Sequence, residues 1–257
     1  MNNKSLEENL IDIMKKCITS VMHNKDKRFQ IKEDGTKLTI ADIKLHNIIK
    51  KSLLTIYPEI PLISEEGEFK EEDFQKKIYW LIDPLDGTSN YASGGNFFTV
   101  NVALIKEGNP IVGIIAHPPS NTIWFGNGEL AYKKTVLKKT MLSTHSDTTS
   151  PKIIVSSHLD PETDLFIKKI KSVKIINYSS SIKFCKIAEG VGDLYPRLTS
   201  IKKWDIAAGD AILRSSGGML LNSKKKNYVY NTATSESGIF FAVSSRTKWI
   251  KILKKYS

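Results

Sequence analysis

Two carboxylates stand close together directly after a hydrophobic run of the chain. Residues 78–82 are apolar, β-branched and aromatic, which predicts a short buried strand, and Pro84 is expected to end it. Asp83 and Asp86 lie at the exit of this strand, where a turn can bring both carboxylates to one point. Because two carboxylates so close repel each other, a cation is expected between them. Carboxylate oxygens favour Mg²⁺ or Mn²⁺.

Gly87 and Thr88 follow at the predicted start of a helix, where backbone N–H groups readily bind phosphate. Residues 83–88 therefore indicate metal-assisted chemistry on a phosphate. The pattern Asp-Pro-x-Asp-Gly is also ordinary turn chemistry. Taken alone, the stretch fits either interpretation.

Three further carboxylates occupy places that would complete such a site. Glu65 follows a predicted short strand at residues 60–64, and Asp205 opens a predicted helix of small residues. Asp42 is the last residue of Thr39-Ile40-Ala41-Asp42, a helix-capping box. Each has a plain structural explanation, as a solvated acidic turn, a helix N-cap or a capping box. Glu65 and Asp205 also have the chemistry that a site with two metals requires.

In order and spacing, these segments resemble the inositol monophosphatase superfamily, a group of lithium-sensitive phosphatases. The similarity spans about residues 5–245 and is carried by Glu65-Glu66, Asp83-Pro84-Leu85-Asp86-Gly87-Thr88, Trp204-Asp205-x-Ala207-Ala208-Gly209 and Thr39-Ile40-Ala41-Asp42. A second group of segments resembles the CysQ-type 3′(2′),5′-bisphosphate nucleotidases of this superfamily: Ser180-Ser181-Ile182-Lys183-Phe184-Cys185, Ala188-Glu189-Gly190 and Leu194-Tyr195-Pro196-Arg197.

The resemblance implies an α/β fold of the layered α-β-α-β-α sandwich type, with the metals between its two halves. One metal would be bound by Glu65, Asp83, the Leu85 carbonyl group and Thr88, a second by Asp83, Asp86 and Asp205, and a weaker third by Glu65. Asp42 would accept a hydrogen bond from Thr88, and this pair together with Glu65 would activate the attacking water. Substrate contacts are implied at Leu85, Asp86, Gly87, Thr88, His158, Ser180, Lys183, Arg197 and Asp205, with Lys183 and Arg197 pairing with a second phosphate.

The implied activity is that of a Mg²⁺-dependent phosphomonoesterase in which Mn²⁺ can replace Mg²⁺. It would remove the 3′-phosphate of 3′-phosphoadenosine 5′-phosphate, a step of sulfur metabolism. The alternative is an inositol-1-phosphate or sugar-phosphate phosphatase, because Ser89-Asn90-Tyr91 departs from the Lys-Glu-Phe common in CysQ-type members. Asp34-Gly35-Thr36-Lys37-Leu38 likewise replaces their proline-containing segment. Both departures bear on the substrate and leave the catalytic residues intact.

The overall charge of the chain also bears on its partners. The 257 residues carry a formal net charge of +11. No arginine-rich arm or zinc-finger spacing accompanies this charge, which favours a polyanionic small substrate over nucleic acid. Attraction to an anionic membrane surface stays open. The two cysteines, Cys17 and Cys185, are predicted core residues, which indicates a reducing compartment such as the cytoplasm.

Two halves are expected. Residues 1–133 would carry most metal ligands and include an antiparallel meander from residue 98 onward. Residues 152–257 would carry Asp205 and the substrate contacts, with Ser179-Ser180-Ser181 capping a helix. The segment 134–151, rich in Lys, Thr and Ser, is the predicted linker. No targeting segment is evident, and both a monomer and a homodimer fit the sequence.

Overall fold

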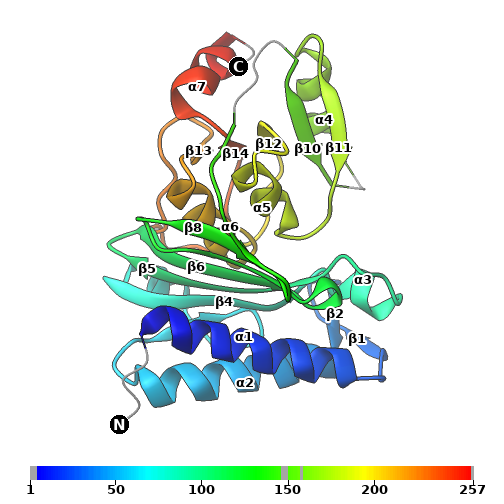
Figure 1. The fold of residues 1–257 in the computed structure, drawn as a ribbon, viewed down its shortest axis with the longest axis vertical. Coiled ribbons are helices and arrows are strands. Elements are labelled where there is room, and N and C mark those ends of the chain that lie inside the picture. The colour runs from blue at the N-terminus through cyan, green and yellow to red at the C-terminus, as the bar shows by residue number, and fades with distance from the viewer. Residues whose placement is uncertain (1–4, 146–149, 157–158, 256–257) are drawn as a thin grey trace.

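The computed structural model of the chain describes residues 5–145, 150–156 and 159–255. Its elements form five layers that alternate between helices and sheets (Figure 1). This is the α-β-α-β-α sandwich expected from the sequence. Within the described residues, no helix is long and apolar enough to cross a lipid bilayer.

The first helical layer consists of α1 (Leu6–His23) and α2 (Ile40–Ile56), which pack along one face of the larger sheet. Both helices begin with a capping box. The Ser5 and Thr39 side chains accept hydrogen bonds from backbone N–H groups of the first turn. The Glu8 and Asp42 side chains in turn accept from the backbone N–H groups of Ser5 and Thr39. Between the helices, β1 (Phe29–Ile31) and β2 (Lys37–Thr39) form a hairpin. The hairpin leads directly into the capped start of α2, which places Asp42.

The larger sheet has seven strands in the order β3-β4-β5-β6-β7-β8-β9, and all pairs are antiparallel except β3 with β4. The strands are β3 (Leu62–Ser64), β4 (Ile78–Asp86), β5 (Thr99–Lys106), β6 (Asn109–His117), β7 (Thr122–Gly126), β8 (Ala131–Lys134) and β9 (Lys139–Met141). The predicted meander is therefore present. It also reaches into residues 134–151, because β9 adds an edge strand where the sequence predicts a linker.

Pro84 does not end strand β4, contrary to the prediction. β4 runs on through Pro84 to Asp86, and its register with β5 becomes irregular between Asp83 and Asp86. Proline cannot donate to a strand ladder and is tolerated at an irregularity or an edge. On the other side, β3 pairs with β4 only as far as Ile82, so that no ladder partner is lost at Pro84.

The smaller sheet has the order β11-β10-β12-β14-β13. Its strands are β10 (Lys152–Val155), β11 (Lys174–Asn177), β12 (Leu194–Arg197), β13 (Met219–Asn222) and β14 (Phe240–Val243). Between the two sheets lie α5 (Ile182–Ala188) and α6 (Trp204–Ser215), while α4 (Pro161–Lys168) and α7 (Arg246–Lys255) form the outer layer. Two 3₁₀ turns, Glu71–Gln75 and Pro118–Ser120, and the short helix α3 (Thr88–Ala92) complete the fold.

Helix α6 lies unusually close to the larger sheet. A Cβ atom on Gly126 would lie 2.7 Å from the Cα atom of Ile212, and one on Gly113 would meet the carbonyl oxygen of Ala208. These glycines therefore allow the small-residue face of α6 to sit directly on β6 and β7. The close packing fixes the position of the first turn of α6, which carries Asp205.

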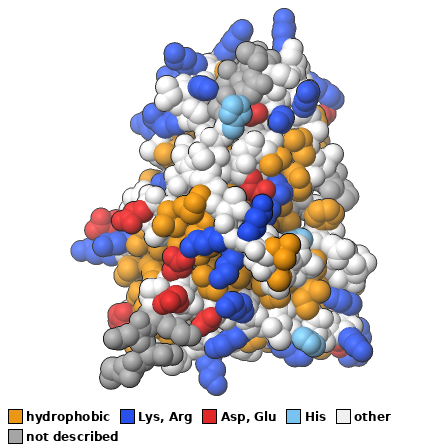
Figure 2. All heavy atoms as spheres, in the orientation of Figure 1, with side chains coloured by type: hydrophobic (Ala, Val, Ile, Leu, Met, Phe, Trp, Pro, Cys, Tyr) orange, Lys and Arg blue, Asp and Glu red, His pale blue; other side chains and the backbone are white. Residues whose placement is uncertain are grey.

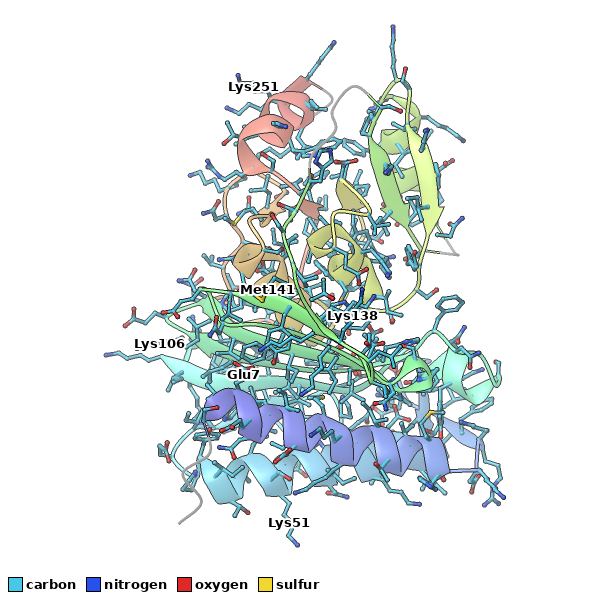
Figure 3. All side chains as sticks on the ribbon, in the orientation of Figure 1. Glu7, Lys51, Lys106, Lys138, Met141 and Lys251 are labelled. Carbon is cyan, nitrogen blue, oxygen red and sulfur yellow. The ribbon has the colours of Figure 1, made fainter. Side chains whose placement is uncertain are left out.

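Side chains fill the space between the helical layers and the sheets, and charged side chains extend outward from the surface (Figure 3). Residues 151–257 contain 19 Lys and Arg against 8 Asp and Glu, so that the whole net charge of +11 lies in this part of the chain. Figure 2 shows basic side chains around the end formed by α7, β10 and β11. Exposed lysines on this end include Lys168, Lys169, Lys171, Lys174, Lys248, Lys251, Lys254 and Lys255.

Candidate active site

Three carboxylates from distant parts of the chain meet between the two sheets. Glu65, Asp83 and Asp205 each present an oxygen, and these atoms lie within 4.8 Å of one another. The Asp83 side chain is buried, with its Oδ1 accepting from the Leu85 backbone N–H at 3.0 Å and its Oδ2 without a hydrogen-bond partner. An unpaired, buried carboxylate oxygen among other carboxylates has the chemistry of a cation site.

The electrostatics of the cluster also favour a bound cation. Burial raises the pKa of Asp83 well above its ordinary range, and the neighbouring charges of Glu65 and Asp86 add to this effect. The pKa of Asp205 is raised well above its ordinary range for the same reasons. Since both burial and like charges disfavour the ionised form, a divalent cation would stabilise the ionised cluster.

Secondary structure explains why these residues converge. Strands β3 and β4 are parallel neighbours, and the Glu65 N–H donates to the Ile82 carbonyl oxygen at 3.1 Å, so Glu65 at the end of β3 lies beside Asp83 on β4. Asp205 lies in the first turn of α6, where its Oδ2 accepts from the Lys202 N–H at 3.1 Å. The position of Asp205 is thus fixed both by the packing of α6 and by the geometry of its first turn.

Asp86 lies beside this cluster, and protein donors already occupy one of its oxygens. Asp86 Oδ2 accepts from the backbone N–H and, at 2.8 Å, from the hydroxyl group of Ser181, with the Thr99 hydroxyl at 3.4 Å. Ser181 stands at the N-cap of α5, but its side chain makes no capping bond, contrary to the prediction. Sequence reasoning missed this contact because Asp86 and Ser181 are far apart in the chain.

Thr88 connects the cluster with Asp42. Its Oγ1 lies 3.0 Å from Asp42 Oδ1 and 2.9 Å from the Leu85 carbonyl oxygen. The other Asp42 oxygen accepts from the Thr39 backbone N–H and hydroxyl group. Burial raises the pKa of Asp42. Gly87 precedes α3 with a φ of 92°, a left-handed conformation that glycine adopts without strain and that turns the chain toward the cluster.

A cavity of about 140 Å³ adjoins the carboxylates. It is lined by Asp86, Ser180, Lys183, Phe184, Tyr195, Ile201 and Asp205. The Lys183 side chain is buried, with its ammonium nitrogen 5.1 Å from the centre of the Tyr195 ring, and burial lowers its pKa to about 8. The Ser180 hydroxyl is buried without a hydrogen-bond partner.

Arg197, another predicted substrate residue, is not part of this lining. Arg197 ends β12, and its Nε donates to the Thr199 carbonyl oxygen at 3.4 Å. Its charge is close enough to contribute to the lowered pKa of Lys183. His158 lies outside the described residues.

Sequence reasoning also missed Lys32. This residue follows β1, and its ammonium group pairs with Glu65 at 3.0 Å and with Glu66 at 2.8 Å. Of the three side chains, Glu66 is the most buried. Local signals were weak: Lys32 precedes the Glu33-Asp34-Gly35 turn, and nothing in the spacing relates it to residues 65 and 66.

The segment Ser89-Asn90-Tyr91 packs within its own loop. Asn90 Oδ1 accepts from the Phe97 backbone N–H at 2.8 Å, and Tyr91 is buried against Phe98, with their ring centres 5.0 Å apart. The Tyr91 hydroxyl accepts from Asn24. None of these residues is among those lining the 140 Å³ cavity described above.

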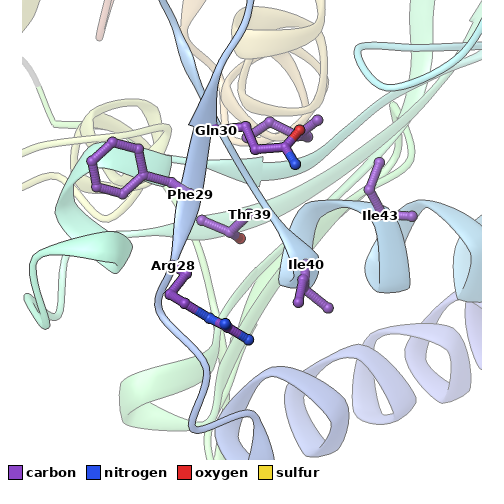
Figure 4. Close-up of a pocket in the computed structure, with 7 residues that line it drawn as sticks. Arg28, Phe29, Gln30, Thr39, Ile40 and Ile43 are labelled. Carbon is purple, nitrogen blue, oxygen red and sulfur yellow. The ribbon is translucent and has the colours of Figure 1, made fainter.

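A larger hollow of about 450 Å³ lies over the β1–β2 hairpin and the start of α2 (Figure 4). Its lining is Arg28, Phe29, Gln30, Leu38, Thr39, Ile40 and Ile43. It contains no carboxylate and no potential nucleophile except the Thr39 hydroxyl, which is engaged with Asp42. Only the smaller of these two cavities adjoins the carboxylates.

Known proteins are similar in sequence to most of this chain. The sequence profile of the inositol monophosphatase family matches residues 2–247. A 3′(2′),5′-bisphosphate nucleotidase CysQ from Buchnera aphidicola is 36% identical over 227 residues, which is 87% of this chain and 85% of that protein. The protein of the same name from Escherichia coli K12 is 34% identical over 217 residues, or 83% and 87% of the two chains.

Solved structures give the same result. CysQ from Bacteroides thetaiotaomicron, described as a bacterial member of the inositol monophosphatase family, matches with a TM-score of 0.78 at 30% identity and covers 94% of this chain and 98% of its own. An inositol monophosphatase-type structure described as bound to 2′AMP also has a TM-score of 0.78, at 19% identity, covering 98% of this chain and 94% of its own. The chain belongs to the inositol monophosphatase family.

Proposed function

We propose that this protein is a Mg²⁺-dependent phosphomonoesterase that removes the 3′-phosphate of 3′-phosphoadenosine 5′-phosphate, giving AMP and phosphate. The observation that carries this proposal is the juxtaposition of a partly buried carboxylate cluster with a buried lysine in an adjoining cavity. The first suits metal-assisted attack on one phosphate. The second suits the charge of another phosphate on the same substrate.

The carboxylates divide into two ligand sets. Glu65, Asp83, the Leu85 carbonyl group and Thr88 would hold one cation. Asp83, Asp86 and Asp205 would hold another, and Glu65 would contribute to a weaker third site. Bound Mg²⁺ would neutralise the phosphate charge and lower the pKa of a water molecule so that hydroxide is available near neutral pH.

The residues around the cations have separate tasks. When Thr88 donates its proton to Asp42, its lone pairs are left to accept a hydrogen bond from the attacking water, and so orient it. Glu65 lies across the cluster as a further acceptor for this water. The backbone N–H groups of Gly87 and Thr88, at the start of α3, would bind the phosphoryl oxygens.

Lys183 supports the choice of a bisphosphate. Among the described residues none forms an ion pair with it, although the side chain is buried. A phosphate in the cavity would stabilise its ammonium form, with Ser180 as a hydrogen-bond donor and Arg197 as a second positive charge. His158 would complete the nucleotide contacts.

The alternative substrate is inositol 1-phosphate or a sugar phosphate, suggested by Ser89-Asn90-Tyr91. Asn90 and Tyr91 contact Phe97, Phe98 and Asn24 and are absent from the lining of the cavity, so we attribute this departure to local packing around α3. Phosphate release from both substrates, with Mg²⁺ and with chelator, separates the two assignments. We expect the bisphosphate to be preferred and the chelator to abolish turnover. A kcat/KM for inositol 1-phosphate about tenfold higher than for the nucleotide, or ~1.4 kcal/mol, would refute the substrate assignment.

We further infer a cytoplasmic location with peripheral contact to an anionic membrane. Both cysteines are buried and free, which suits a reducing compartment. The lysine-rich end formed by α7, β10 and β11 supplies positive charge, which anionic lipid would attract. Sedimentation with vesicles containing about 30% phosphatidylserine, against neutral vesicles as a control, tests this contact. Equal sedimentation with both would contradict it.

A further inference from the structure

Ser181 touches four elements at the point where the two halves of the molecule meet. It precedes α5, and its hydroxyl oxygen lies 2.8 Å from Asp86 Oδ2 on β4 and 2.8 Å from the Asp205 carbonyl oxygen on α6. The Asn101 side-chain amide on β5 donates to the same hydroxyl at 2.9 Å. Both Ser181 and Asn101 are buried, at 2% and 1% exposure.

The hydrogen-bond chemistry of this contact is restrictive. A hydroxyl group has one proton, and here an amide donor occupies one of its acceptor positions. The proton must therefore go to Asp86 or to the Asp205 carbonyl group, and the bond to the charged carboxylate is the stronger of the two. Asn101 thus orients the hydroxyl group toward Asp86.

The consequence for Asp86 is an assignment of its two oxygens. Oδ2 receives the backbone N–H and hydroxyl group of Ser181 and the weaker contact from Thr99. Protein donors therefore occupy Oδ2, and Oδ1 is the atom left for a cation. The Asp205 carbonyl oxygen lies 2.8 Å from the same hydroxyl oxygen, so the first turn of α6 adjoins this contact.

We propose that Ser181, oriented by Asn101, is a positioning residue for the second metal site. It occupies Asp86 Oδ2 and so directs Asp86 Oδ1 to the cation. This inference rests on the proposed metal-dependent function. Partners that orient metal ligands typically change affinity by about 10–100-fold when removed.

The test measures Mn²⁺ binding without substrate, by electron paramagnetic resonance of free Mn²⁺ during titration of the intact protein. In Ser181→Ala, we expect one of the two tighter sites to weaken by about tenfold or more while the other is unchanged. The Mg²⁺ concentration for half-maximal activity should rise in parallel, with little change in the KM for substrate. Asn101→Ala should weaken the same site less, because the hydroxyl group remains but is no longer oriented.

Ser216→Ala is the matched control. Ser216 is also a buried serine, but its hydroxyl group donates to the Leu213 carbonyl oxygen at the far end of α6. This variant should lower thermal stability without changing either Mn²⁺ affinity. If Ser181→Ala does not fold, Ser181→Cys replaces it, since a thiol of similar size is a weaker donor and should weaken the same site.

The outcomes are distinct. Mn²⁺ affinities in Ser181→Ala and Asn101→Ala that equal those of the unmodified protein would overturn the inference, and so would equal weakening of both sites. A protein that hydrolyses phosphate but binds a single Mn²⁺ would overturn it as well. Failure of the proposed function is a different result, in which Mn²⁺ binds at two sites but neither phosphorylated substrate is hydrolysed.

Discussion

Thr88 Oγ1 lies 3.0 Å from Asp42 Oδ1, and the other oxygen of the same carboxylate caps helix α2 through Thr39. One buried carboxylate therefore has two tasks, one in the fold and one in the candidate active site. The two tasks use different oxygens, and substitutions at either end of the contact separate them.

Replacing Thr88 should affect activity while leaving the cap of α2 in place. In Thr88→Val the shape of the side chain is kept but the hydroxyl group is lost, so the attacking water is no longer oriented. We expect kcat to fall by about 10²–10⁴-fold, while the other Asp42 oxygen still caps α2 through Thr39. In Asp42→Asn, activity should fall similarly, and the damaged cap should also cost about 1 kcal/mol of stability. Steady-state kinetics and thermal melting measure both effects. A kcat for Thr88→Val close to that of the unmodified enzyme would contradict the proposed role.

Replacing Asp83 should have opposite effects on activity and on metal-free stability. Asp83→Asn removes the carboxylate shared by the two ligand sets, so turnover should be lost while circular dichroism is unchanged. Burial and neighbouring charges raise the pKa of Asp83, so its ionised form destabilises the metal-free protein at neutral pH. In chelator, we therefore expect Asp83→Asn to melt at least about 2 °C higher, a shift that corresponds to ~1 kcal/mol in a chain of this size. Retained turnover would refute the ligand assignment.

The pH dependence of catalysis should report Lys183. Burial lowers its pKa to about 8, so its ammonium form is present below that pH and is lost as the pH rises through it. The kcat/KM for a bisphosphate should therefore decline above about pH 8, whereas that for a simple monophosphate should not. Lys183→Arg keeps the charge at all these pH values and should remove the decline. An identical pH profile in both proteins would show that another group is responsible.

Lys32 should compete with a cation for Glu65. Its ammonium group pairs with Glu65 and Glu66, and a divalent ion at Glu65 must displace or share that contact. In Lys32→Gln, Mn²⁺ should bind this carboxylate about fivefold more tightly, which corresponds to ~1 kcal/mol for the lost ion pair. Lys37→Gln on the same hairpin is the control, because the Lys37 ammonium group lies over the Phe29 ring. Equal Mn²⁺ affinities in the two variants would argue against competition.

Much of the candidate site could be predicted because its carboxylates stand at positions with strong local signals. Glu65 and Asp83 end short apolar runs, and Asp42 belongs to a capping box, features that depend on neighbouring residues only. The meander follows in the same way from alternating strands, whereas the layered architecture is implied by the family resemblance. The family resemblance then assigns these carboxylates to one metal site.

The remaining features depend on contacts between distant segments. Nothing near Ser181 in the sequence indicates that its hydroxyl group turns away from its own helix to Asp86. Lys32 reaches Glu65 only because the hairpin folds over the end of β3. Pro84 is predicted to end β4 because proline has no backbone N–H to donate. The neighbouring residues do not indicate that the register with β5 becomes irregular at this point, which lets the strand continue. Contacts of this kind depend on tertiary packing and cannot be predicted from neighbouring residues.

The division of the ligands between the two halves has a consequence for synthesis of the protein. Glu65 and Asp83 leave the ribosome early, whereas Asp205 emerges only after the whole larger sheet and part of the smaller one. The proposed set of ligands is therefore incomplete in the nascent chain until α6 docks on β6 and β7. During that interval Lys32 is available as an internal counter-charge for Glu65, before any divalent ion can be held from both sides.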